Sequence, residues 1–161
     1  MTVSRVIVRL ATPADAPNAI ALVRASISEL CVDDHQHDLA TLERWLSNKT
    51  VESFLRWLAD PDSYLVVAEL GDALQGVGSA RKGGLVTLLY VAPGRQGAGV
   101  GSAILSELEA RAARWGDREL SLTSSRRARA FYERRGFVAA GEPQRKFGVL
   151  IEYPYRKALD P

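Results

Sequence analysis

The chain has 161 residues, which fits one compact domain, and its formal net charge is +2 at pH 7. Hydrophobic residues make up 47% and charged residues 25%, the composition of an ordinary globular protein. This small charge gives no reason to expect a nucleic-acid partner or a membrane surface. A single cysteine, Cys31, excludes an internal disulfide and fits a reducing compartment. The first ten residues lack the apolar core of a signal peptide. We therefore expect a cytoplasmic protein with one domain over residues 1–161.

The N-terminal third predicts one strand followed by helices. Apolar residues in Val6–Leu10 indicate a short strand. The segment Thr12–Asp15 is typical of a helix start, with Thr as the cap, Pro at the first position and an acid three residues on. A second helical region is predicted from about Asp38 to Leu58, with a break near residues 48–50.

The rest of the chain predicts a mixed α/β order with an antiparallel start and a parallel centre. The expected strands are Tyr64–Leu70, Gln75–Arg81, Leu85–Val91, Glu119–Thr123 and Phe147–Tyr155. The expected helices run from near Gly99 to Trp115 and from Ser125 to Arg135.

A glycine-rich segment follows the central strand and opens the next helix. It contains four glycines in eight residues, from Gly94 to Gly101. Glycines allow the backbone to approach a ligand closely, and the first turn of a helix carries unpaired N–H groups that favour negative charge. The segment therefore predicts a site for a phosphate or pyrophosphate.

Three phosphate-binding patterns compete for this segment. The nucleoside-triphosphate loop needs a Lys after its last glycine, but Gly101 is followed by Ser102. The dinucleotide pattern needs a third glycine where Ser102 stands. A third pattern, Gln/Arg-x-x-Gly-x-Gly/Ala, fits Gln96, Gly99 and Gly101 without a mismatch.

A second block decides between them. The segment after Glu119 leads from a strand into Ala-x-x-Phe-Tyr-Glu-x-x-Gly-Phe, carried by Ala128, Phe131 and Tyr132 and ending at Phe137. Together with the glycine loop, at this spacing, the block resembles the GNAT-type N-acetyltransferases, which move an acetyl group from acetyl-CoA to an amine. The resemblance covers about residues 64 to 141.

The resemblance implies a three-layer fold. We expect a central mixed sheet of about six to seven strands, with a splayed central pair and four to five helices on both faces. It also implies acetyl-CoA as cosubstrate and no metal. The implied coenzyme-binding residues are Tyr90, Val91, Arg95, Gln96, Gly97, Ala98, Gly99, Val100, Gly101, Ser102, Ser125, Ala128, Phe131 and Tyr132.

Two residues take catalytic roles by the resemblance. The backbone N–H of Val91 is the expected oxyanion donor, and Tyr132 is the expected general acid for the departing thiolate. A packing role for Tyr132 is the alternative, because it lies on one helical face with Ala128 and Arg135. Ser125 stands where many family members carry Asn, so it either contacts the coenzyme or only caps the helix.

The general base is not readable, because the central strand contains no acid. The polar run after the first helix supplies acceptor-site candidates, namely Glu29, Asp33, Asp34 and His35. A solvated loop is the alternative interpretation of that run. We expect no metal at its two histidines, because no further ligands cluster with them.

These observations predict an N-acetyltransferase that acts on a primary amine by direct transfer in a ternary complex. The alternatives are a non-catalytic or regulatory acyl-CoA-binding module of the same fold, and an acyltransferase that uses another acyl-CoA. The expected partner is a small-molecule or peptide amine, with neither membrane nor nucleic acid. The family often forms homodimers, and the apolar final strand could contribute to one.

Overall fold

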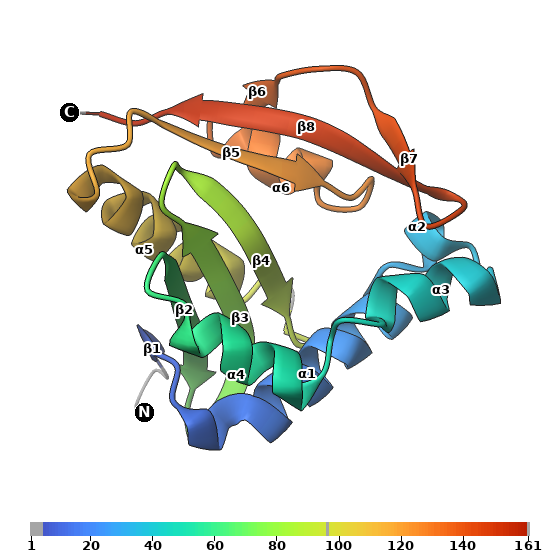
Figure 1. Ribbon diagram of the computed structural model, residues 1–161, viewed down its shortest axis with the longest axis horizontal. Coiled ribbons are helices and arrows are strands. Elements are labelled where there is room, and N and C mark those ends of the chain that lie inside the picture. Colours follow the sequence, from blue (N-terminus) through green and yellow to red (C-terminus); the bar gives the residue numbers. More distant parts are fainter. Residues whose placement is uncertain (1–4, 96, 161) are drawn as a thin grey trace.

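A computed structural model describes residues 5–95 and 97–160, which build one mixed sheet with helices on both faces (Figure 1). The strand order is β1-β2-β3-β4-β5-β8-β6, and β7 pairs with β8. The strands are β1 (Val6–Leu10), β2 (Ser63–Leu70), β3 (Ala73–Arg81), β4 (Leu85–Val91), β5 (Glu119–Ser124), β6 (Val138–Ala139), β7 (Gln144–Lys146) and β8 (Leu150–Ala158). The α-helices are α1 (Ala16–Ala25), α2 (Val32–His35), α3 (Leu39–Leu46), α4 (Val51–Ala59), α5 (Val100–Arg114) and α6 (Arg129–Arg134).

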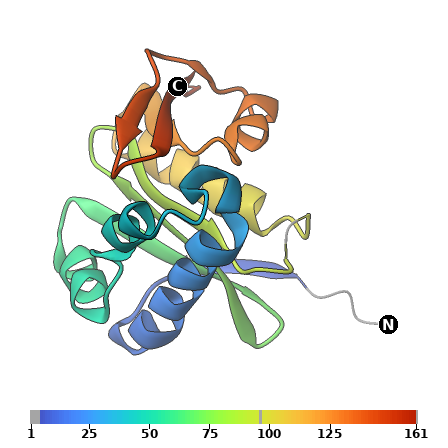
Figure 2. The ribbon, with the colours of Figure 1, turned by 90° about the vertical axis from the view of Figure 1, so that its right-hand side faces the viewer.

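Every paired neighbour in the sheet is antiparallel except β4 and β5, which are parallel. Figure 2 shows α3 and α4 on one side of the sheet, and the glycine loop with α6 on the other. The expected mixed sheet with helices on both faces is thus confirmed. The sheet holds eight strands within the described residues, more than the six to seven expected. The short strands β6 and β7 were not predicted, because they have no clear apolar pattern in the sequence.

The central strands are apolar on both faces because each face is covered by helices. In β2, Leu65 and Val67 belong to the core beside α1 and α4, whereas Val66 and Ala68 belong to the core beside α5. All four are at most 2% exposed. This strand therefore reads as a continuous apolar run rather than an alternating one.

The predicted break in the second helical region is confirmed. Helix α3 ends at Leu46, and Thr50 caps α4 by accepting a hydrogen bond from the N–H of Ser53 at 3.1 Å. Asp38 caps α3 in the same way, through the N–H of Thr41 at 3.1 Å. Two short capped helices replace one long helix because each cap satisfies donors that a continuous helix would bond internally.

The C-terminal half differs from expectation at two places. Helix α6 begins at Arg129 rather than Ser125, because residues 126–128 form a turn that the Ser125 hydroxyl caps. The last strand begins at Leu150 rather than Phe147, because Phe147 and Gly148 form the turn between β7 and β8, with φ of 60° and 125°.

Within residues 5–95 and 97–160, no helix has both the length and the apolar character that crossing a membrane requires.

Close packing of α5 on β3 requires glycine in that strand. A Cβ added at Gly78 would overlap Cγ2 of Ile104, and one at Gly76 would lie 2.6 Å from Cδ1 of the same side chain. Ile104 is fully buried, so it has no free space into which to move.

We predict that Gly78→Ala lowers the free energy of unfolding by about 1–3 kcal/mol, because the added methyl group overpacks this contact. Denaturant unfolding with wild-type protein alongside measures it. Gly141→Ala is the matched control, since its Cβ would meet Pro154 at an ordinary 3.6 Å. Equal stability of the two variants would contradict the packing argument.

Candidate functional site

Strands β4 and β5 pair at one position and then separate. Their only described pairing joins Leu85 to Ser121, next to a hydrogen bond of 2.7 Å from the Ser121 N–H to the Gly84 carbonyl oxygen. A register shift opposite residues 79 and 80 leaves Thr87 as an extra residue in β4. Figure 1 shows the two strands diverging beyond that point. The expected splayed pair is therefore present.

The splay leaves one edge of β4 facing a space instead of a strand. The N–H of Ala92 donates to Gln75 in the strand on the other side, at 2.9 Å. Successive N–H groups of a strand point to opposite sides, so the N–H of Val91 points into the splay. A ligand lying there meets strand donors and acceptors that no neighbouring strand uses.

A cavity of about 920 Å³ runs through this opening from one face of the sheet to the other. We call the part beside the glycine loop and α6 the loop end; its lining includes Arg95, Gly97, Gly99, Phe131 and Arg134. We call the part beside α1, α3 and the β7–β8 hairpin the helix end; its lining includes Ser26, Trp45, Lys49, Phe147 and Glu152.

The loop end exposes backbone donors. Gly94, Gly97 and Gly99 all have φ between 82° and 85°, a left-handed conformation that favours glycine, and a Cβ at any of them would meet nothing within 4 Å. Gly99 is the N-cap of α5, and the N–H of Ala103 is the donor that bonds back to it, at 3.0 Å.

Three predicted positions, Val100, Gly101 and Ser102, therefore form the first turn of α5, where N–H groups lack intrahelical acceptors. Ala98 precedes them in the loop, and its N–H bonds to the Arg95 carbonyl at 3.3 Å. Gln96 lies outside the described residues.

The first turn of α5 is fixed against α6. A Cβ at Gly101 would lie 3.0 Å from the ring of Phe131, so this glycine permits the two helices to touch. The Arg135 guanidinium lies 3.8 Å from the centre of the same ring and donates to the Ser102 hydroxyl. The predicted residues Phe131 and Ser102 thus lie together, and Ala128 lines the same cavity.

Tyr132 also lines the cavity. Only 6% of the residue is exposed, and its ring packs edge-on against Phe131 and Phe137. Burial raises the pKa of the Tyr132 phenol well above its ordinary value, and the nearby Tyr90 adds to that rise. The phenol therefore keeps its proton at neutral pH, as a proton donor must.

Ser125 also lines the cavity, and its hydroxyl accepts a hydrogen bond from the N–H of Ala128 at 3.2 Å. Ser125 therefore caps the turn before α6, as one of the two interpretations of this residue predicted. The buried side chain of Asp34 also stabilises the turn at residues 126–128, because its Oδ1 accepts a hydrogen bond from the N–H of Arg126 at 2.7 Å. Burial raises the pKa of Asp34, and hydrogen bonds from the backbone of Arg126 and Arg127 oppose that rise.

The four acceptor-site candidates do not line the cavity. Glu29 and Asp33 are exposed, whereas Asp34 and His35 are buried in α2. The His35 ring bonds to the Ser28 carbonyl oxygen at 3.1 Å through Nε2 and accepts from the His37 N–H at 3.1 Å. The polar run is thus a short helix with two structural side chains rather than a solvated loop.

The helix end contains charged side chains that the sequence analysis did not single out. Lys49 is 8% exposed, and its Nζ donates to Asn48 Oδ1 at 2.6 Å and to the Trp45 carbonyl oxygen at 3.4 Å. Burial, together with the nearby Lys146, lowers the pKa of Lys49 to about 8. The Trp45 Nε1 donates to the Tyr90 hydroxyl at 3.4 Å, which links α3 to the central strand.

Glu152 in β8 is the one acidic residue among the described residues that line the cavity. Its Oε1 lies 3.1 Å from Nζ of Lys146 in the paired strand. Lys49 follows α3 and Glu152 lies in the last strand, so no motif spacing in the sequence connects the two residues. The available signal in the sequence was a single charged residue, Glu152, within the otherwise uncharged stretch 147–155.

Cys31 lines the cavity as well. Burial raises the pKa of its thiol to about 12, so the thiolate that a covalent acetyl transfer would need does not form near neutral pH. Across residues 5–95 and 97–160, no group of three or more His, Cys, Asp or Glu side chains is arranged to hold a metal ion.

Comparison with solved structures supports the fold over nearly the whole chain. A GCN5-related N-acetyltransferase from Rhodopseudomonas palustris is 26% identical, with 99% of each chain covered and a TM-score of 0.86. The PaiA N-acetyltransferase from Thermoplasma acidophilum, solved with coenzyme A, is 18% identical over 96% of this chain and 99% of that one, with a TM-score of 0.81. An acetyltransferase from Thermus thermophilus is 24% identical, covers 99% and 100%, and has a TM-score of 0.73.

No match was found among curated protein sequences. The family model described as acetyltransferase (GNAT) domain matches residues 26–159, a span that holds the splayed strands, the glycine loop and α6. The chain therefore belongs to the GNAT family of acetyltransferases.

Proposed function

We propose that this protein transfers an acetyl group from acetyl-CoA to a primary amine by direct transfer in a ternary complex. The observation that carries the proposal is that one cavity joins a strand edge without a neighbour, a glycine loop at a helix start and a buried phenol. The solved relatives crystallised with coenzyme A include the PaiA enzyme and an aminoglycoside 6'-N-acetyltransferase, which supports the choice of donor.

The residues of the loop end fit the coenzyme. The first-turn N–H groups of α5 suit the pyrophosphate, because the helix start favours negative charge and the glycines leave room for it. Arg95 and Arg134 line the same end and add positive charge. The extended pantetheine arm suits the free edge of β4, where it pairs as a further strand would. When bound, acetyl-CoA supplies the acetyl group as an activated thioester.

Two groups act on the thioester in this proposal. The N–H of Val91 points into the splay and donates to the carbonyl oxygen as negative charge develops there. Tyr132 donates its phenolic proton to the departing sulfur. Its raised pKa means that the phenol carries a proton at neutral pH.

Glu152 is the proposed general base. The incoming amine is an ammonium near neutral pH and must lose a proton before it attacks. Glu152 is the carboxylate that the described cavity lining offers, and it lies at the helix end, across the splay from the loop end. The protonated thiol of Cys31 supports direct transfer over a route through an acetylated cysteine.

The proposed function is tested by calorimetry and by thiol release. Calorimetry should detect binding of acetyl-CoA and CoA, but not of ATP or NAD. A thiol-release assay over a panel of amines should then show turnover with acetyl-CoA. Binding without turnover for every amine would favour the acyl-CoA-binding module, and faster turnover with a longer acyl-CoA would change the donor.

We expect Tyr132→Phe to lower kcat by about tenfold or more, because the departing thiolate loses its proton donor. The variant is compared with wild type at saturating substrates across a range of pH. Tyr153→Phe is the matched control, since Tyr153 lies in β8 away from the cavity lining. Unchanged turnover in Tyr132→Phe would leave that side chain with a packing role.

For Glu152→Gln we expect kcat/KM to fall by about a hundredfold near neutral pH, because the amide cannot accept the amine's proton. The loss should shrink as the pH rises and more acceptor enters as free amine. Glu119→Gln serves as the control, because Glu119 is half exposed in β5 and lies outside the cavity lining. A loss that stays the same at every pH would speak against Glu152 as the base.

A further inference from the structure

We propose that the acceptor carries a carboxylate beside its amine, as an α-amino acid does, and that the ammonium groups of Lys49 and Lys146 bind that carboxylate at the helix end of the cavity. This inference rests on the proposed function, since it names the class of acceptor for the same site.

The charges at the helix end match such a zwitterion. Its described lining holds the cations Lys49, Lys146 and Arg81 and the single anion Glu152. Arg81 forms an ion pair with Asp60, and Lys146 forms one with Glu152, so Lys49 is the lysine of this described lining without a carboxylate partner. The acceptor's ammonium can share Glu152 with Lys146, and its carboxylate can pair with Lys49 and with Lys146.

Lys49 is placed as a binding group rather than a surface charge. Its residue is 8% exposed, and its Nζ has two hydrogen-bond acceptors, the amide oxygen of Asn48 and the backbone carbonyl of Trp45, both uncharged. A buried ammonium with neutral partners and a neighbouring cation is costly to keep charged. Glu152 offsets part of this cost, but it is paired with Lys146, so a carboxylate bound in the cavity would add a counter-charge for Lys49.

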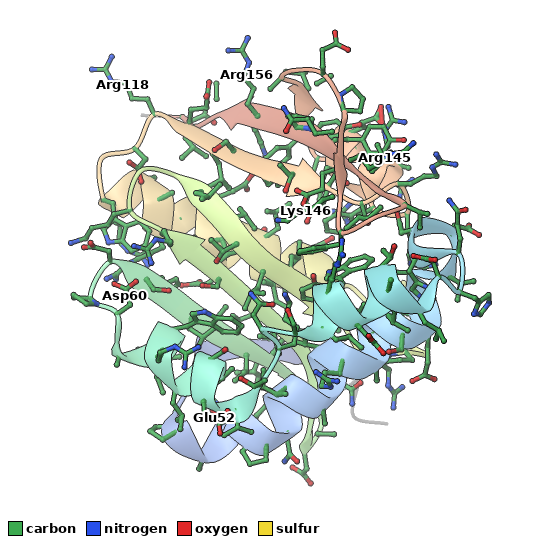
Figure 3. The ribbon with its side chains drawn as sticks, turned by 45° about the vertical axis from the view of Figure 1, so that its right-hand side comes forward. Glu52, Asp60, Arg118, Arg145, Lys146 and Arg156 are labelled. Carbon is green, nitrogen blue, oxygen red and sulfur yellow. The ribbon has the colours of Figure 1, made fainter. Side chains whose placement is uncertain are left out.

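The hairpin that carries Lys146 and Glu152 is fixed against the helix that leads to Lys49. The N–H of Val149 donates to the Thr41 hydroxyl at 3.0 Å, and that hydroxyl donates to Asp38 Oδ2 at 2.5 Å. A Cβ at Gly148 would lie 2.5 Å from the same hydroxyl oxygen, so glycine permits this close approach. In Figure 3, Lys146 lies on the side of β7 that faces the space above α3.

The same inventory argues against a polycationic acceptor. Polyamines and aminoglycosides bring several ammonium groups, each of which needs an acid or another acceptor when it leaves water. The described lining offers Glu152 alone, and its two lysines would repel further positive charge. The aromatic side chains of Trp45, Trp57 and Phe147 suit the body of an amino acid instead.

The first arm of the test is turnover. Thiol release is measured with the twenty common L-amino acids, with their α-amides, and with spermidine and kanamycin. We expect at least one amino acid to exceed its own amide in kcat/KM by about tenfold or more, because only the acid can pair with the lysines. Lys49→Met should reduce that preference to near unity, whereas the control Lys82→Met should retain it, since Lys82 is half exposed and outside the cavity lining.

The second arm is binding without chemistry. The N-acetylated amino acids are titrated into the enzyme–CoA complex by calorimetry, because they keep the carboxylate and lack a titrating amine. Their affinity should fall as the pH rises past about 8, because Lys49, with a pKa of about 8, then loses the charge that attracts the ligand carboxylate. Lys49→Arg should keep the affinity and lose this pH dependence.

The outcomes separate the two proposals. Lys49-dependent binding of the N-acetyl amino acids without turnover of any amine would contradict the proposed function and leave the carboxylate site standing. Turnover of amides, spermidine or kanamycin as fast as the best amino acid would overturn the inference and leave the function. Lys146→Met, at a half-exposed position, repeats the test if Lys49→Met fails to fold.

Discussion

The cavity of this protein exists because β4 and β5 pair along only a small part of their length. They share one described pairing, Leu85 with Ser121, and the extra residue Thr87 bends β4 away from its neighbour. A sheet normally satisfies its backbone by pairing every strand. Here the central strand keeps donors and acceptors for a ligand, and the cavity exists because the sheet stays open at this point.

Burial shapes the chemistry of the cavity as much as the residue types do. The phenol of Tyr132 and the thiol of Cys31 keep their protons, since burial raises both pKa values. The same removal from water makes the ammonium of Lys49 easier to deprotonate, with a pKa of about 8. Burial thus disfavours the charged form of each of these three groups, whereas Glu152 and Lys146 form an ion pair.

The sequence predicted the elements whose signals are local. The strand Leu85–Val91 has its expected bounds because an apolar run ends at a proline turn, and the break before α4 was readable because Thr50 is a cap. Contacts between distant residues were not readable. Asp34 holds the turn before α6 through a residue 92 positions away, and Glu152 reaches the cavity only because β8 pairs beside β5. The charged residues of the helix end, Lys49, Lys146 and Glu152, therefore emerged from the tertiary structure.

Because the sheet is open, a ligand bound in the splay should raise the stability of the fold. A molecule that fills the splay, by pairing with β4, joins two half-sheets that otherwise meet at Leu85 and Ser121. Ligand at a hundred times its dissociation constant adds about 2.7 kcal/mol to the free energy of unfolding. Because cellular proteases cleave chains that open, a ligand bound in the splay would slow the degradation of this protein.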